Sequence, residues 1–275
     1  MVTIAPWAVQ SGRGTAVTNS GTFALGKKDP MPAEYAGDCL DAPSKGALFG
    51  LCLDSVCGPT SLSATPSDTV KFASRGGLYH VAGWEGEPDL VVSGINSGAN
   101  VANSVTDSGT VGAAVAAIED DIPAVAFSTN GLSDFSAFPV ANYRATAEYG
   151  ARLLSALRAK KLLLQHKFAL NVNYPNISEG KAAKKAVWTS ISDGMFAYHY
   201  YTKKDDGSFT VGLKVCEGLA LCEVTRKDAD KVWVNDKNHI SISPINWDRT
   251  YGHSIDGKRE LAKVRDFVKN HAPKP

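Results

Sequence analysis

The chain has 275 residues, of which 44% are hydrophobic and 21% charged, and this composition fits one large or two small globular domains with a sizeable core. Its formal net charge of +1 excludes the strongly basic balance that is typical of proteins binding nucleic-acid polymers or anionic membranes. No apolar run reaches the ~18 residues of a membrane span. The opening residues, MVTIAPWAVQSGRG, do not have the pattern of a signal peptide.

Strands are predicted where short apolar runs occur, at 2–6, 89–94, 123–128 and 168–175. Residues 26–64 are rich in Gly, Pro, Asp and Ser and are predicted to form a loop. Helices are expected from Thr65-Pro66-Ser67-Asp68 onward, at 110–118 and at 143–164. The alternation of strand and helix predicts an α/β fold, a three-layer Rossmann-like doubly wound sheet.

The pattern changes from about residue 187, where two hairpins are predicted, FAYHYYTKKDDGSFTVGLKV and VWVNDKNHISISPI. A C-terminal helix is expected at 257–271. These features predict antiparallel hairpins and a helix appended to the sheet. We expect one domain over 1–275, with a variable insert at 26–64 and a hairpin region at 187–245 that embraces a partner subunit.

The five cysteines include no C-x-x-C pair, and no histidine stands at zinc-ligand spacing from them, so a zinc site is not expected. Cys39, Cys52 and Cys57 share one loop-like stretch, and Cys216 and Cys222 flank a short turn. The spacing is consistent with one or two disulfides and equally with free buried thiols.

The segment after the strand at 89–94 is unusually rich in small polar residues. Residues 94–117 read GINSGANVANSVTDSGTVGAAVAA, with Asp107 as the single charge. Ligands bind beyond the C-terminal ends of strands in open α/β sheets, and a helix that begins near Thr110 offers free N–H groups to a phosphate. Ser108 is a candidate cap for that helix. Asn96 and Asn100 add neutral donors and acceptors that suit a hard metal ion or a phosphate oxygen.

The sequence of this segment also allows other interpretations. It is also consistent with a strand-to-helix turn that binds nothing. Thr106-Asp107-Ser108-Gly109-Thr110 looks like the Asp-Ser-Gly-Thr of an aspartic protease, but that chemistry needs two such carboxylates and the chain has one copy. No G-x-S-x-G elbow occurs, although a serine esterase of another type remains an alternative.

Several segments together resemble the SurE family of survival-protein nucleotidases and phosphatases. The main match is DLVVSGINSGANVANSVTDSGTVGAA, and four others agree in order: VTIAPWAVQSGRG, SATPSDTVKFA, ALNVNYPN and HISISPI. The resemblance implies metal-dependent hydrolysis of phosphate monoesters, mainly nucleoside monophosphates. Mg²⁺ or Mn²⁺ is the implied cofactor.

The resemblance also implies a set of site residues. Ser11 and Asn96 match the family's metal-binding Ser and Asn, and Asn96, Asp107 and Ser108 are the candidate catalytic residues. Asn100, Ser108, Gly109 and Thr110 are the candidate phosphate ligands. The expected partner is a small-molecule phosphate ester, with neither a nucleic-acid polymer nor a membrane. A homodimer or homotetramer is expected by analogy with the fold.

One part of the family pattern has no counterpart in this sequence. The family begins with a strand that ends in Asn-Asp-Asp-Gly and supplies the metal carboxylates, whereas this sequence starts at the family's second strand. Lys204-Asp205-Asp206-Gly207 imitates the motif but reads as a hairpin turn. Asp107 is the nearest other carboxylate. A miscalled start, a rearranged sheet and a lost activity are the three explanations left open.

The leading hypothesis is therefore a metal-dependent phosphomonoester hydrolase, impaired by the missing strand. The alternatives are a metal-independent carboxylic-ester hydrolase that uses the same cleft, and a non-catalytic nucleotide- or phosphate-binding protein. The expected compartment is the cytoplasm, or the periplasm or cell exterior if an upstream signal has been lost.

Overall fold

The computed structural model describes residues 1–28, 48–162 and 168–247. Residues Met1–Ile245 form one compact unit, the first of the two into which the chain divides. The predicted helix at 257–271 lies outside the described residues. Among the helices of the described ranges, none combines the length and apolar character needed to cross a membrane.

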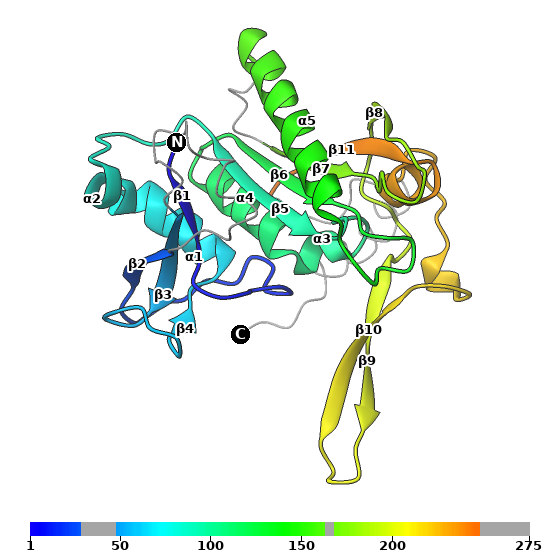
Figure 1. Ribbon diagram of the computed structural model, residues 1–275, viewed down its shortest axis with the longest axis horizontal. Coiled ribbons are helices and arrows are strands. Elements are labelled where there is room, and N and C mark those ends of the chain that lie inside the picture. Colours follow the sequence, from blue (N-terminus) through cyan, green and yellow to red (C-terminus); the bar gives the residue numbers. More distant parts are fainter. Residues whose placement is uncertain (29–47, 163–167, 248–275) are drawn as a thin grey trace, which may run out of the picture. The chain divides into compact units, whose positions relative to one another are not determined.

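A five-stranded sheet forms the centre of the first unit (Figure 1). Its strand order is β5-β6-β7-β11-β8, and β5, β6 and β7 run parallel to one another. Strand β11 is antiparallel to β7 and parallel to β8. The bounds of these strands are Val91–Ser97 (β5), Ala124–Thr129 (β6), Ala169–Tyr174 (β7), Lys184–Trp188 (β8) and His239–Ile245 (β11).

Helices α4 (Gly109–Glu119) and α5 (Val140–Ala159) cover the two faces of this sheet. Side chains alternate between the faces of a strand, and β6 shows this directly. Ala124 and Ala126 pack with the buried side chains of α4, whereas Val125 and Phe127 belong to the cluster that includes α5. The small residues of α4 let it lie close against the sheet. This arrangement confirms the predicted three-layer Rossmann-like α/β fold.

Strand β5 is less buried than its continuous apolar sequence predicts. Every residue of β6 is buried, but Val92 of β5 is 51% exposed. Within the described residues, β5 pairs with β6 along one edge only. A strand with one open edge keeps part of its side chains accessible to solvent.

A second, smaller sheet precedes the first in the chain. Strand β1 (Thr3–Pro6) is parallel to β3 (Leu48–Leu53), and β2 (Ala24–Lys28) and β4 (Leu62–Ser63) are antiparallel to β3. The strand predicted at 2–6 is present as β1, whereas the prediction of a loop throughout 26–64 is wrong for β3, β4 and the end of β2. The apolar run LFGLCL buries Gly50, Leu51 and Cys52, and buried backbone groups need the partners that a sheet supplies. Cys52 forms a disulfide with Cys57.

The Thr-Pro-Ser-Asp signal does begin a helix, α1 (Pro66–Phe72). Thr65 and Asp68 form a capping box, in which each side chain accepts a hydrogen bond from the other residue's backbone N–H. The irregular turn Ala73–Gly77 joins α1 to α2 (Leu78–Ala82). Asp68 also accepts hydrogen bonds from the N–H and hydroxyl of Thr18, at 2.7 and 2.8 Å, which ties the preceding loop to this helix.

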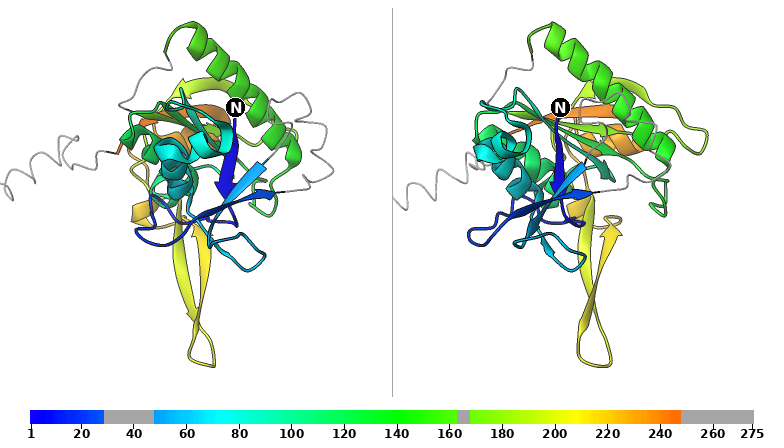
Figure 2. Two further views of the ribbon diagram at one scale, coloured as in Figure 1. Left: turned by 90° about the vertical axis from the view of Figure 1, so that its left-hand side faces the viewer. Right: turned by 60° about the vertical axis from the view of Figure 1, so that its left-hand side comes forward.

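The first predicted hairpin is present. Strands β9 (Ala197–Lys203) and β10 (Phe209–Val215) pair with each other and, among the described strands, with no other. The Asp-Asp-Gly sequence forms its turn, where Gly207 N–H donates to the carbonyl of Lys204. Both views of Figure 2 show this hairpin extending away from the sheet. A disulfide between Cys216 and Cys222 follows it.

The second predicted hairpin is wrong. Val232–Asp236 forms a helical turn, and β11 inserts into the main sheet between β7 and β8. Both edges of β11 are therefore paired, and Ile240, Ser241 and Ser243 are buried. Local alternation alone does not reveal a partner strand that lies about 70 residues earlier, as the Ser241–Asn173 pair shows.

A close backbone contact holds the loop that follows β1 against α4. Gly14 N–H donates to the carbonyl of Asp107 at 2.9 Å. A Cβ on Gly112 would lie 1.9 Å from the carbonyl oxygen of Gly14, so only glycine allows this approach. The contact places residues 10–14 beside the first turn of α4.

We predict that Gly112→Ala lowers the free energy of unfolding by roughly 1–3 kcal/mol, because the added methyl group overpacks the contact. Urea denaturation measures the loss. Gly86→Ala is the matched control, since a Cβ there meets no atom within 4 Å. Equal stability of the two variants would show that the loop can move away from α4 without cost.

Candidate functional site

A cavity of about 740 Å³, here called the cleft, lies between the smaller sheet and the first turn of α4. One side is formed by β1, β3 and the segment after β1, and the other by the end of β5 and the start of α4. The lining residues that carry the following argument are Gln10, Ser11, Asn96, Gly109 and Thr110.

The N-terminus of α4 opens into the cleft. The Ser108 hydroxyl caps the helix by accepting a hydrogen bond from Val111 N–H at 3.1 Å. Gly109 and Thr110 occupy the first helical positions, whose N–H groups have no acceptor within the helix. Together with the partial positive charge of a helix N-terminus, these groups favour an anion.

Asn96 enters the cleft from the end of β5. The β5–β6 register shifts between Ser93 and Asn96, at Gly94, where a Cβ would lie 2.3 Å from the carbonyl oxygen of Phe127. The Asn96 Nδ2 donates to the carbonyl of Gly98 at 2.8 Å, and its Oδ1 accepts from the Thr110 hydroxyl at 3.4 Å. The side chain is thus held from both β5 and α4.

Three asparagines support the loop that links β5 to α4. Asn100 N–H donates to Asn173 Oδ1 at 2.7 Å, and its carbonyl accepts from Asn171 at 2.8 Å and Asn173 at 3.2 Å. The Asn100 side chain donates to the Ser128 hydroxyl. All three asparagines are buried. Asn171 and Asn173 have the spacing N-x-N in ALNVNY, which puts both amides on one face of β7. This spacing is the sequence signal that could have revealed the support.

Asp230 holds the same loop further along. Its Oδ1 accepts hydrogen bonds from the N–H groups of Ala102 at 3.3 Å, Ser192 at 2.9 Å and Lys231 at 2.7 Å. Its Oδ2 has no partner among the described residues, and the residue is fully buried. Burial raises the pKa of this carboxyl to about 6, although the hydrogen bonds from the three N–H groups lower it. Nothing in the local sequence indicates this contact.

The structure brings together some of the predicted site residues and not others. Ser11, Asn96, Gly109 and Thr110 line the cleft. Ser108, Asp107 and Asn100 are not among its lining residues. Ser108 is 8% exposed and acts as the helix cap, Asn100 faces the sheet, and the exposed Asp107 contributes its carbonyl to Gly14. The chemical roles assigned to these residues stay predictions.

The donor set of the cleft does not by itself fit the divalent metal ion that the sequence suggests. Its lining has hydroxyl, amide and carbonyl oxygens, but no carboxylate among the described residues. Nor does the described part of the chain contain a cluster of three His, Cys, Asp or Glu side chains suited to a metal. Mg²⁺ and similar hard cations are usually held through at least one carboxylate. The described lining instead offers the free N–H groups at the start of α4, which favour an anion.

We predict a pH-dependent difference in the free energy of unfolding between the wild type and Asp230→Asn. As the pH falls from 7 to 4.5, this difference shifts in favour of the wild type by roughly 2 kcal/mol. The pKa of Asp230 is raised to about 6 in the folded chain, so folding favours the protonated form and the gain is lost as the pH rises through 6. Urea denaturation across this pH range checks it. Asp205→Asn, in the exposed hairpin turn, is the control. A pH-independent difference between wild type and Asp230→Asn would contradict the assignment.

Comparisons with known proteins show which family the chain resembles. The family described as "Survival protein SurE" matches residues 1–197. The "5'-nucleotidase SurE" of Thermosynechococcus vestitus is 32% identical over 208 residues, covering 74% of this chain and 71% of that protein. That of Cytophaga hutchinsonii is 32% identical over 261 residues, covering 94% and 84%.

The fold is shared with a solved structure of the same family. The crystal structure of the Sure protein from Aquifex aeolicus has a TM-score of 0.56 at 21% identity, covering 94% of this chain and 85% of that one. At this identity the likeness concerns the fold. The family match extends over most of the chain, and its segment includes both sides of the cleft. The chain belongs to the SurE family.

Proposed function

We propose that this chain hydrolyses phosphate monoesters, with nucleoside monophosphates as substrates. As a SurE family member it is an enzyme of the hydrolase class, and its curated relatives carry the name 5'-nucleotidase. The observation that carries the proposal is the N-terminus of α4, which faces the cleft beside Ser11 and Asn96. The free N–H groups of a helix start, with uncharged polar side chains on the same lining, are a setting that favours a phosphate group.

The residues of the cleft have separable tasks in this proposal. The N–H groups of Gly109 and Thr110 bind the phosphoryl oxygens, where negative charge is concentrated during hydrolysis. The Ser11 hydroxyl donates a further hydrogen bond. Asn96 is held by Gly98 and Thr110, so its orientation is fixed before substrate binds. Fixed dipoles of this kind need no reorganisation during the reaction, which is the source of their effect on rate.

The metal dependence that the sequence resemblance implies stays a prediction, and the EDTA condition of the test below decides it. The described lining supplies Ser11 and Asn96 and lacks the carboxylate that Mg²⁺ or Mn²⁺ needs. The same observation favours a second candidate function, phosphate or nucleotide binding without turnover. The alternative of a serine esterase gains no support, because the Ser108 hydroxyl caps α4 and the residue is nearly buried.

The predicted homodimer or homotetramer also belongs to this proposal. Strands β9 and β10 expose large apolar side chains, and both strands lack a further partner strand among the described residues. Such a surface suits contact with another subunit. The exposed residues are Tyr200, Tyr201, Phe209, Val211 and Leu213.

The test is phosphate release from AMP and from phenyl phosphate, with Mg²⁺, with Mn²⁺ and with EDTA. We expect release from both esters, and a fall in kcat/KM of roughly 10- to 100-fold in Ser11→Ala and Asn96→Ala, because each loses a polar contact to a charged group. Ser20→Ala and Asn19→Ala are matched controls at exposed positions outside the lining.

A second measurement separates the two candidate functions. Binding of inorganic phosphate is detected as a rise in the melting temperature of the chain. Stabilisation that Asn96→Ala removes, without phosphate release under any metal condition, would establish the non-catalytic alternative. If inorganic phosphate does not stabilise the chain and no phosphate is released from either ester, the assignment of the cleft is refuted.

A further inference from the structure

A second cavity lies on the loops that follow β6 and β7, and it shares no lining residue with the cleft. Its volume is about 400 Å³, within the range of small-molecule sites. We call it the amide pocket, because four asparagines line it: Asn130, Asn176, Asn235 and Asn238.

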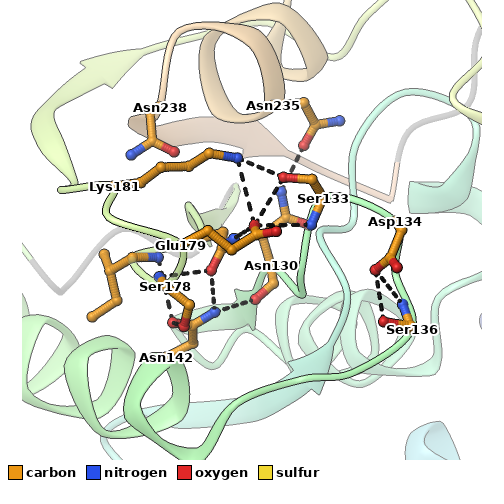
Figure 3. A network of polar contacts seen from close by, with 12 residues as sticks. Asn130, Ser133, Asp134, Ser136, Asn142, Ser178, Glu179, Lys181, Asn235 and Asn238 are labelled. Carbon is orange, nitrogen blue, oxygen red and sulfur yellow. Dashed lines mark hydrogen bonds and ion pairs between the residues drawn. The ribbon is translucent and has the colours of Figure 1, made fainter.

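The wall of the amide pocket is organised by hydrogen bonds between side chains (Figure 3). Asn130 Nδ2 donates to Asn235 Oδ1 at 2.9 Å. Asn142 of α5 donates to the Asn130 carbonyl and to Asn176 Oδ1, both at 2.9 Å. Asn176 donates to Glu179 at 2.8 Å. These contacts fix the amides in place before any ligand enters, and preorganised polar groups are typical of binding sites.

Asn235 keeps hydrogen-bonding capacity that this network does not use. Its Oδ1 is the acceptor for Asn130, whereas its Nδ2 donates to no group within the described residues. Asn130 is 7% exposed, and its Oδ1 also lacks a partner there. An amide donor without an acceptor at the wall of a cavity suits a ligand that brings acceptor atoms.

The charges on the lining cancel. Lys181 donates to the Ser133 hydroxyl at 2.6 Å, and Lys231 Nζ donates to the carbonyls of Met195 at 2.8 Å and Cys222 at 3.3 Å. Glu217 and Asp236 contribute two carboxylates to the same lining. Two cations and two anions favour a neutral ligand over phosphate. Carboxylates are also acceptors for hydroxyl groups.

Two aromatic rings complete the lining. Phe135 and Phe196 lie edge to face, with ring centroids 5.8 Å apart. Phe196 N–H donates to Asn103 Oδ1 at 2.8 Å, so this wall is joined to the loop that links β5 to α4. Aromatic side chains, amides and carboxylates around one cavity match a planar heterocycle that carries hydroxyl groups.

We propose that the amide pocket binds a neutral nucleoside, with Asn235 Nδ2 as a donor to the base. The inference rests on the proposed function for its substrate class, since a nucleotidase meets nucleosides in two forms. One is the nucleoside moiety of the bound monophosphate, and the other is the free nucleoside that hydrolysis releases. The same pocket chemistry fits both.

A calorimetric titration of the full chain with adenosine tests the pocket, and it does not require the chain to turn over a substrate. Asn235→Asp is the informative variant, because its carboxylate still accepts the hydrogen bond from Asn130 but has no amide donor. We expect at least 10-fold weaker adenosine binding in Asn235→Asp, and unchanged binding in the matched control Asn19→Asp at an exposed position. Binding of inorganic phosphate should be unaffected in both variants.

Failure of the pocket and failure of the proposed function give different results. No adenosine binding by the wild type, or equal binding by Asn235→Asp, overturns the pocket whatever the chain hydrolyses. Adenosine binding that Asn235→Asp weakens supports the pocket even if no phosphate is released. Asn235→Leu, with its melting temperature measured, is a second variant should Asn235→Asp fold poorly, and it is expected to lose adenosine binding as well.

Kinetics distinguish the two sources of the nucleoside. If the pocket holds the nucleoside moiety of the substrate, Asn235→Asp raises KM for AMP at unchanged kcat, and KM for phenyl phosphate stays the same. If it holds the free product, neither KM changes and adenosine does not compete with AMP. Either pattern, with weakened adenosine binding, supports the pocket.

Discussion

The site depends on how the buried backbone N–H and carbonyl of one residue, Asn100, find hydrogen-bond partners. The N–H and carbonyl of Asn100 lie above the ends of β6 and β7, where no backbone partner is available to them. The side chains of Asn171 and Asn173 provide both partners. A buried backbone group without a partner costs free energy comparable to a lost hydrogen bond, so these amides determine where the loop can run. Because they project from a central strand, the loop has the rigidity of the sheet.

This support reaches the cleft through short, directional contacts. Asn96 precedes Asn100 by four residues and donates a hydrogen bond to its Oδ1. The capped start of α4 follows Asn100 in the chain, and the Thr110 hydroxyl of this helix donates to Asn96 Oδ1. On the opposite side, Asp68 ties the loop after β1 to α1. Some buried polar atoms near the ends of these strands, including Asn171 Oδ1 and Thr129 Oγ1, have no partner among the described residues.

The sequence was sufficient for the features that depend on local pattern. The strands around β5, β6 and β7, the helix start at Thr65 and the cap at Ser108 all follow from periodicity and capping preferences. Features set by distant partners were missed: β3 inside a Gly-rich segment, and β11 between two other strands. The same holds for the site. Small polar residues marked the loop, but Asp230 contacts Ala102 across 128 positions, which no local pattern reveals.

The proposed assignments divide recognition between the two cavities according to charge. In them, the cleft would bind its ligand through helix N–H groups and neutral side chains, which attract an anion but do not distinguish one phosphate ester from another. A site of this kind also binds inorganic phosphate, the product, so tight binding there alone would slow turnover. The amide pocket has balanced charges and amide and aromatic side chains, so it can discriminate by ring shape and hydrogen-bonding pattern. If the pocket holds the nucleoside moiety of the substrate, selectivity need not come from tight binding of the anion, and the cleft can release its product.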